Sequence, residues 1–255
     1  MVQGHVMYLD EKDTLELATR EIYEPIETQV LERYVIPGCL VLDLGANIGY
    51  YTLLAARLTG DSGRVLAFEP DPENHRLLLK NIEANRYRNV VPDPRAVSDV
   101  GGKARLFLNE TNRGDHRLVD PGDGRKSVPI VTVDLDSVLK EVQVRRAFVK
   151  MDIQGSEWKA FCGMQSFLSR TPQVALVSEY WPEGLRQSGD DPRMLPDAME
   201  KAGFSLFEID EKNRSVQPTT VGELLRKMPD EHDVYTNLLG LKGLEPDPSW
   251  GSKAG

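Results

Sequence analysis

The stretch Val41-Leu-Asp-Leu-Gly-Ala-Asn-Ile-Gly49 decides the fold of this chain. Its apolar residues are typical of a buried strand, and a helical pattern begins directly after it at Tyr50. Between strand and helix lie two glycines, Gly45 and Gly49, and glycine permits the tight turn that joins a parallel strand to a helix. The stretch therefore predicts a strand, a turn and the N-terminus of a helix.

A second signal follows in the next apolar run, at residues 65–68, which ends in Glu69. An acidic residue at the end of the second strand of such a unit accepts hydrogen bonds from the two hydroxyls of a ribose. Together the glycine turn and this carboxylate predict a cofactor that contains a nucleoside.

Along the rest of the chain, short apolar runs alternate with helical patterns. This alternation predicts an α/β fold, Rossmann-like, with a mostly parallel seven-stranded sheet and helices on both faces. The expected strands are 39–44, 65–68, 90–97, 147–151, 174–178, 204–209 and 233–241. The expected helices are 50–58, 71–85, 134–142, 157–168 and 197–202, preceded by a short and a longer helix within 14–35 that meet at Pro25.

The remaining segments predict an insertion and two long loops. Alternating runs at 104–108 and 128–133 indicate an inserted β-hairpin. The polar loops 109–127 and 182–196 are longer than a compact domain usually contains, which is typical of functional loops. We predict an N-terminal helical segment at 1–38, one domain at 39–243 and a flexible tail at 244–255.

Composition limits the partners that we expect. The chain has 255 residues and a net charge of −9, with no block of Lys and Arg to neutralise phosphates, so we expect no nucleic-acid partner. The two cysteines match no metal or redox spacing and are expected to be reduced thiols. No run reaches the ~18 apolar residues of a membrane span, and the first residues lack the apolar core of a signal peptide. We expect a cytoplasmic protein without a membrane partner, and its oligomeric state, a homodimer included, stays open.

The glycine turn favours S-adenosylmethionine (SAM) over NAD. A dinucleotide site uses three glycines to bring a diphosphate to the helix N-terminus, whereas this turn has only two. Asp43, just before the turn, would repel a diphosphate but can order the turn or accept a hydrogen bond from an ammonium group. SAM carries an ammonium, a sulfonium and no phosphate, so the charge pattern predicts SAM.

Several distinct short motifs are distributed along nearly the whole chain. They are Tyr23-Glu24-Pro25, the opening stretch through Thr52, Gly63-Arg-Val-Leu-Ala-Phe-Glu-Pro70, Asn81, Ala96-Val-Ser-Asp99, Val133-Asp-Leu-Asp-Ser-Val138, Lys150-Met-Asp-Ile-Gln-Gly-Ser-Glu157 and Thr236-Asn-Leu-Leu239. With these motifs the chain resembles the FkbM family of SAM-dependent methyltransferases over about residues 20–242. The motif that begins at Asp152 is the most specific, although many relatives carry Glu where this chain has Gln154.

The resemblance implies a class I methyltransferase fold and transfer of a methyl group to a hydroxyl of a sugar or natural-product small molecule. It implies that Glu69 binds the ribose. It also implies that four residues shape the pocket for the methionine part and that the region from Asp93 to Val97 flanks the adenine. These residues are Asp43, Gly45, Asn47 and Gly49 for methionine, and Asp93, Ala96 and Val97 for adenine.

Two side chains are catalytic candidates. Asp152 ends the fourth core strand, at the sheet edge where ligands bind, and is expected beside the methyl group; it can also cap the following helix. His116, in the loop 109–127, titrates near neutrality and can take a proton from the acceptor, unless it is a solvated loop histidine.

Three alternatives stay open at this stage. Asp152 and Glu179, which end adjacent strands, are candidate oxygen ligands for a divalent metal, although the prediction is a reaction without metal. A nucleic-acid methyltransferase is a second alternative, disfavoured by the acidic balance. A SAM-binding scaffold without catalysis is the third. Methyl transfer from labelled SAM separates the enzymes from the scaffold.

Overall fold

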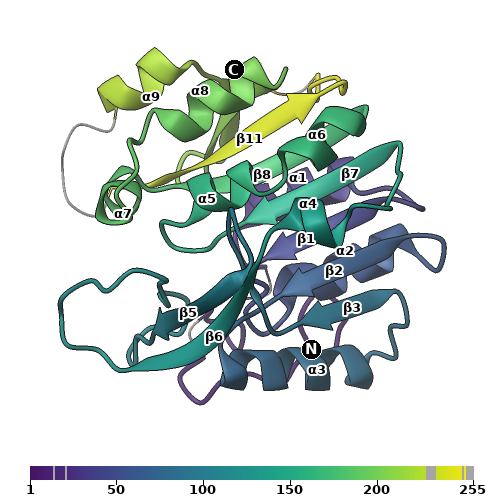
Figure 1. Cartoon of the computed structure of the whole chain (residues 1–255). Helices are drawn as coiled ribbons and strands as arrows, with labels where there is room; N and C mark the ends of the chain where they lie inside the picture. The colour runs from purple at the N-terminus through teal and green to yellow at the C-terminus, as the bar shows by residue number, and fades with distance from the viewer. Residues whose placement is uncertain (14, 21, 228–233, 249, 251–255) are drawn as a thin grey trace.

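The computed structural model describes residues 1–13, 15–20, 22–227, 234–248 and 250. Within these residues the main sheet has eight strands in the order β10-β9-β11-β8-β7-β1-β2-β3 (Figure 1). Its parallel strands are β1 (Leu40–Leu44), β2 (Arg64–Phe68), β3 (Val90–Asp93), β7 (Arg146–Met151) and β8 (Gln173–Tyr180). Its antiparallel strands are β9 (Ser205–Asp210), β10 (Ser215–Pro218) and β11 (Thr236–Lys242).

The predicted α/β architecture is confirmed, with one strand more than the seven expected. The added strand is β10, which forms a hairpin with β9 at one edge of the sheet. The predicted strand 90–97 is divided, because Pro94 has no N–H with which to continue the ladder. Its second part, β4 (Ala96–Val97), belongs to a separate small sheet.

The predicted inserted hairpin is confirmed and forms most of that small sheet. β5 (Gly102–Phe107) pairs antiparallel with β6 (Ser127–Val133), and β6 pairs with β4. Figure 1 shows the hairpin on the same side of the molecule as α7 (Pro182–Gln187). The loop 109–127 at the hairpin tip is thus placed near the carboxyl ends of the parallel strands.

Helices cover both faces of the main sheet, as predicted. One face packs against α1 (Pro25–Tyr34), α2 (Tyr50–Thr59) and α3 (Pro72–Ala84). The other packs against α4 (Leu135–Val138), α5 (Glu157–Cys162), α6 (Gln165–Arg170) and α8 (Met194–Lys201). Side chains of a strand point alternately to the two faces, so Val41 joins the first core and Leu42 the second.

Three local predictions were wrong. The segment before Pro25 is not helical in its described residues, and α1 begins at Pro25, whose fixed φ and missing N–H suit a first helical position. The predicted helix 157–168 is two helices, α5 and α6, with a break at Gly163. The predicted loop 182–196 contains α7 and the start of α8. The helix α9 (Val221–Lys227) was not predicted.

Side chains of α3 fasten the N-terminal segment to the domain. Asn81 accepts a hydrogen bond from the N–H of Tyr8 and donates one to its carbonyl, and Asn85 does the same for Val6. This pairing imitates a strand ladder.

The described part of the predicted tail packs against α1. The Tyr34 hydroxyl donates to the carbonyl of Glu245, and Trp250 lies against the Tyr34 ring. Residues 249 and 251–255 of the tail, and residue 233 at the start of the last predicted strand, lie outside the described residues. In the described ranges no helix is long and apolar enough to cross a membrane.

Candidate active site

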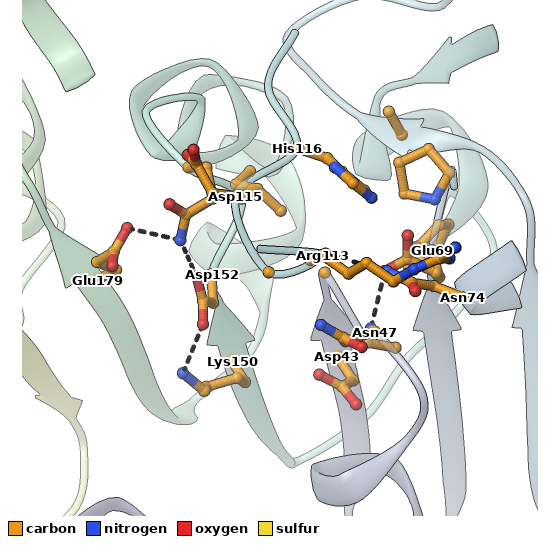
Figure 2. A pocket seen from close by; sticks show the side chains of 18 of the residues that line it. Asp43, Asn47, Glu69, Asn74, Arg113, Asp115, His116, Lys150, Asp152 and Glu179 are labelled. Atoms are coloured by element: carbon orange, nitrogen blue, oxygen red, sulfur yellow. Dashed lines mark hydrogen bonds and ion pairs between the residues drawn. The ribbon is translucent and has the colours of Figure 1, made fainter. Parts of the chain in front are cut away.

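A cavity of about 390 Å³ lies at the carboxyl ends of β1, β2, β7 and β8 (Figure 2). It brings together most of the residues predicted from the sequence: Asp43, Gly45, Asn47, Glu69, Ala96, Val97, His116, Asp152 and Glu179. Gly49 and Asp93 are not among its lining residues. Gly49 lies at the N-cap of α2 with a φ of 99°, and Asp93 binds the guanidinium of Arg95, which does line the cavity.

The glycine turn brings two strands of the sheet close together. Gly45 has a φ of +84°, and its N–H donates to the carbonyl of Phe68 at 3.0 Å. A Cβ at Gly45 would lie 2.0 Å from the carbonyl oxygen of Asp152. Non-bonded contacts of real Cβ atoms are essentially never shorter than 3.0 Å, so only glycine allows the loop after β1 to pass over the end of β7.

Glu69 joins the glycine turn to the loop after β2. Its Oε2 accepts from the N–H of Asn47 and its Oε1 from the N–H of Asp71, both at 2.8 Å. The residue is 5% exposed, and burial raises the pKa of its carboxyl to about 8. A carboxylate oxygen accepts more than one hydrogen bond, so Glu69 can hold both loops and still accept from two ligand hydroxyls.

Asp43 is buried beneath the turn. Its Oδ2 accepts from the Thr52 hydroxyl at 2.5 Å, and the strand register places it beside Lys150. Burial raises the pKa of Asp43 to about 6, although the Thr52 hydrogen bond opposes this. Asp43 is thus a candidate partner for a cationic group in the cavity.

The side-chain amide of Gln154 lies between the carboxylates of Asp152 and Glu179 and donates a hydrogen bond to each. The Nε2 of Gln154 donates to Asp152 Oδ1 at 2.7 Å and to Glu179 Oε2 at 3.1 Å, as Figure 2 shows. The other oxygen of Asp152 lies 3.8 Å from Lys150 Nζ. Burial raises the pKa of Glu179 well above its usual range, with the neighbouring Asp152 adding to the effect.

Sequence reasoning did not identify a second group of side chains at this end of the cavity. Lys150 Nζ binds Glu27 Oε2 at 2.8 Å and lies 5.0 Å from the centre of the Tyr51 ring. The Tyr51 hydroxyl donates to Glu24 Oε2 at 2.8 Å. Glu24, Tyr51 and Lys150 line the cavity. The available signal was a lysine inside the apolar strand 147–151, since an ionisable residue is rarely buried without a partner.

The loop 109–127 covers the cavity from the Glu69 side. His116 Nδ1 accepts from the N–H of Asn109 at 3.0 Å, while its Nε2 lies 3.8 Å from Asp71, the N-cap residue of α3. Burial lowers the pKa of His116. The carbonyl of Arg113 accepts from the side chain of Asn74 at 3.2 Å. His116 thus lies near the N-cap of α3 and the predicted ribose site.

The same loop reaches across to α7. The Arg117 guanidinium lies 4.4 Å from the centre of the Trp181 ring, and its Nη1 donates to Gln187 at 3.0 Å. Contacts on both sides therefore hold the loop over the cavity.

The described residues contain no group of three or more His, Cys, Asp or Glu side chains arranged to hold a metal ion. Where the sequence suggested a cation between Asp152 and Glu179, the Gln154 amide donates to both carboxylates. At this position the two carboxylates therefore act as acceptors for the Gln154 N–H groups.

Comparison with known proteins identifies a family. The family model described as "Methyltransferase FkbM domain" matches residues 43–206. Protein-L-isoaspartate O-methyltransferase 1 of Arabidopsis thaliana is 42% identical over 57 residues, which is 22% of this chain and 25% of the relative. The match thus spans about a quarter of that curated relative's length.

Solved structures are similar at low sequence identity. Methyltransferase FkbM of Methylobacillus flagellatus KT has a TM-score of 0.47 and 16% identity, covering 84% of this chain and 50% of that one. A candidate methyltransferase of Streptococcus mutans, crystallised with SAH, has a TM-score of 0.49 and 9% identity, covering 86% and 96%.

Proposed function

Because this chain belongs to the FkbM methyltransferase family, we propose that it transfers a methyl group to a hydroxyl of a sugar or natural-product small molecule. Membership of the family gives the general activity: the protein is a SAM-dependent methyltransferase, and SAM is its cofactor. Its fold is the class I methyltransferase fold. When bound, SAM supplies the methyl group on a positively charged sulfur. The acceptor and the roles of individual residues are the proposal.

The cavity residues fit SAM. The volume of about 390 Å³ lies within the ~300–1,000 Å³ of small-molecule sites. Glu69 offers acceptors for the ribose hydroxyls. We assign the methionine end to Asp43, Gly45 and Asn47, with Gly49 closing the turn. The adenine end is assigned to the buried apolar residues Ala96 and Val97, with Asp93 holding Arg95 beside them.

Asp152 is proposed to stand beside the methyl group. Its carbonyl contacts the Gly45 turn, and its carboxylate is held by Gln154 near Lys150. A carboxylate fixed there favours a positively charged sulfur and helps to align the acceptor, and alignment is the main task in a displacement of this kind. The catalytic role of His116 stays a prediction, since its Nε2 lies 3.8 Å from Asp71, on the Glu69 side of the cavity.

One observation carries the proposal: a single cavity has the Glu69 carboxylate on one side and the Asp152–Glu179 pair on the other. Such a cavity holds a nucleoside and a small acceptor together. Carboxylates at the acceptor end suit hydroxyl donors and repel a polyanion, which disfavours nucleic acid as the acceptor.

The test is methyl transfer from labelled SAM to a panel of glycosides and hydroxylated metabolites, with RNA as a comparison acceptor. Asp152→Asn should reduce turnover about 10²-fold through lost alignment, while SAM affinity, measured by calorimetry, falls less. Labelling of RNA alone would favour the nucleic-acid alternative. SAM binding without transfer to any acceptor would favour the scaffold.

A further inference from the structure

We propose that Glu24, contributed by the N-terminal segment outside the matched family domain, accepts the proton of the acceptor hydroxyl. This inference rests on the proposed function and adds to it the residue that manages the proton. Its basis is the position of Glu24 in the cavity and the contacts that orient it.

Glu24 is built into the wall of the cavity. It lines the cavity together with Lys150, Asp152 and Glu179, the residues of the acceptor end. The Tyr51 hydroxyl donates to one of its oxygens, Oε2, at 2.8 Å. Among the described residues, no N–H or O–H group donates a hydrogen bond to the other oxygen of Glu24, Oε1. One oxygen thus orients the carboxylate, while the other can receive a proton.

The backbone at Glu24 is held in an uncommon conformation. Its φ is 41° and its ψ is 73°, in the left-handed region, directly before the first turn of α1. Two contacts hold the start of α1: Glu211 Oε1 accepts from the N–H groups of Ile26 and Glu27 at 2.9 and 2.8 Å. Strained residues of this kind cluster at functional sites, where the surrounding structure enforces them.

Asp152 and Glu24 occupy different environments, which indicates different roles. Both oxygens of Asp152 face cationic or N–H groups, from Lys150 and Gln154. Both oxygens of Asp152 are thus directed at nitrogens that carry hydrogens, whereas one oxygen of Glu24 is left to receive a proton. Burial raises the pKa of Glu24 to about 8, with Glu27 adding to the effect. A base whose pKa lies near the working pH transfers protons efficiently.

The charged and titratable groups that act on Glu24 come from several elements. They are Glu27 on α1, Tyr51 on α2, Lys150 on β7 and Asp152 after it. Tyr23, Glu179 and Tyr235 also interact electrostatically with Glu24. Lys150 is the cation of this set, and it is bound to Glu27.

The acceptor oxygen forms a bond to the methyl carbon while the carbon–sulfur bond breaks, and that bond's electron pair stays on sulfur. The hydroxyl proton passes to the Glu24 carboxylate. The positive charge on sulfur and the negative charge on Glu24 are both lost, and the products are a thioether, a methyl ether and a carboxylic acid.

The first experiment needs no acceptor. In ¹³C-carboxyl NMR, the resonance lost in Glu24→Gln reports the titration of Glu24. A base beside the transferred methyl should have a lower pKa with SAM bound than with SAH bound, because only SAM carries the sulfonium charge. Equal values with the two ligands would overturn the inference and leave the proposed function intact. If neither ligand binds, both fail.

The second experiment uses an acceptor from the panel. Glu24→Gln should lower turnover about 10²–10⁴-fold and SAM affinity much less, and the rise of activity with pH near 8 should disappear. Glu24→Asp should restore part of the activity. Glu32→Gln, an exposed carboxylate change on the same helix, is the matched control. A Glu24→Gln variant that folds and retains the pH profile, or a His116→Asn variant that loses it, would overturn the inference.

Discussion

Gly45 and Asp152, which directly follow the neighbouring strands β1 and β7, approach so closely that a Cβ at Gly45 would lie 2.0 Å from the Asp152 carbonyl oxygen. This contact places the cofactor turn directly against the proposed reaction centre. A change in the turn is therefore transmitted to Asp152 without an intermediary.

Gly45→Ala should destabilise the fold and weaken SAM binding at least tenfold, because it adds a collision to the cost of a left-handed φ, which alone is about 1–3 kcal/mol. Gly203→Ala is the matched control: its φ is +89°, close to the +84° of Gly45, and nothing lies within 4 Å of its Cβ position. Thermal unfolding and calorimetry on both variants check this. Equal losses would show that strain alone matters.

Glu69→Gln should weaken SAM binding by roughly 1–3 kcal/mol, because the amide supplies one acceptor oxygen where the carboxylate supplies two. It also sets an N–H₂ against the N–H of Asn47 or Asp71. Glu73→Gln, an exposed change in the first turn of α3, should leave the affinity unchanged. An unaltered dissociation constant for the Glu69 variant would remove the ribose role.

The ligand-free protein should lose stability as pH rises. Burial raises the pKa of folded Glu69 from 4.5 to about 8, so between these values the folded state holds a proton that the unfolded state releases. The contribution is fully present below pH 4.5 and is lost as pH passes about 8, with a slope of at most about 1.4 kcal/mol per pH unit. Thermal unfolding at several pH values should give a flatter curve for Glu69→Gln. Parallel curves for the unaltered protein and the Glu69→Gln variant would contradict a raised pKa of Glu69 in the folded state.

Activity should survive prolonged chelation. The Gln154 amide donates to Asp152 and Glu179, so the two carboxylates already share one hydrogen-bond donor. Turnover before and after dialysis against EDTA, with and without added Mg²⁺, measures the effect. If EDTA removes the activity and Mg²⁺ restores it, Asp152 and Glu179 are metal ligands and this prediction is wrong.

The cofactor side of the cavity could be predicted because its residues are local in sequence. Gly45 and Glu69 each follow an apolar strand directly, and parallel strands bring their carboxyl ends to one edge. For Glu69, the sequence predicted a contact with the ribose of the cofactor. That Glu69 also holds the N–H groups of Asn47 and Asp71 depends on the path of two loops, which no local pattern encodes.

The acceptor side was harder to predict because it is assembled from distant segments. Lys150 was visible as a lysine in an apolar strand, but its partner Glu27 comes from α1. Glu24 precedes α1 and is oriented by Tyr51 of α2, a contact between segments 27 residues apart. The helix α7 was missed since six residues give little periodicity, and it is stabilised by close packing: a Cβ at Gly184 would lie 2.0 Å from the Trp181 ring.

The position of β11 has a consequence for biosynthesis. Residues 236–242 pair on one side with β8 and on the other with β9, both of which precede them in the chain. A ribosome releases those two strands first, so the nascent chain exposes two unpaired edges until β11 emerges and is inserted between them. The sheet is therefore completed only after β11 has emerged, and a polypeptide interrupted before β11 should depend on chaperones and be prone to aggregation.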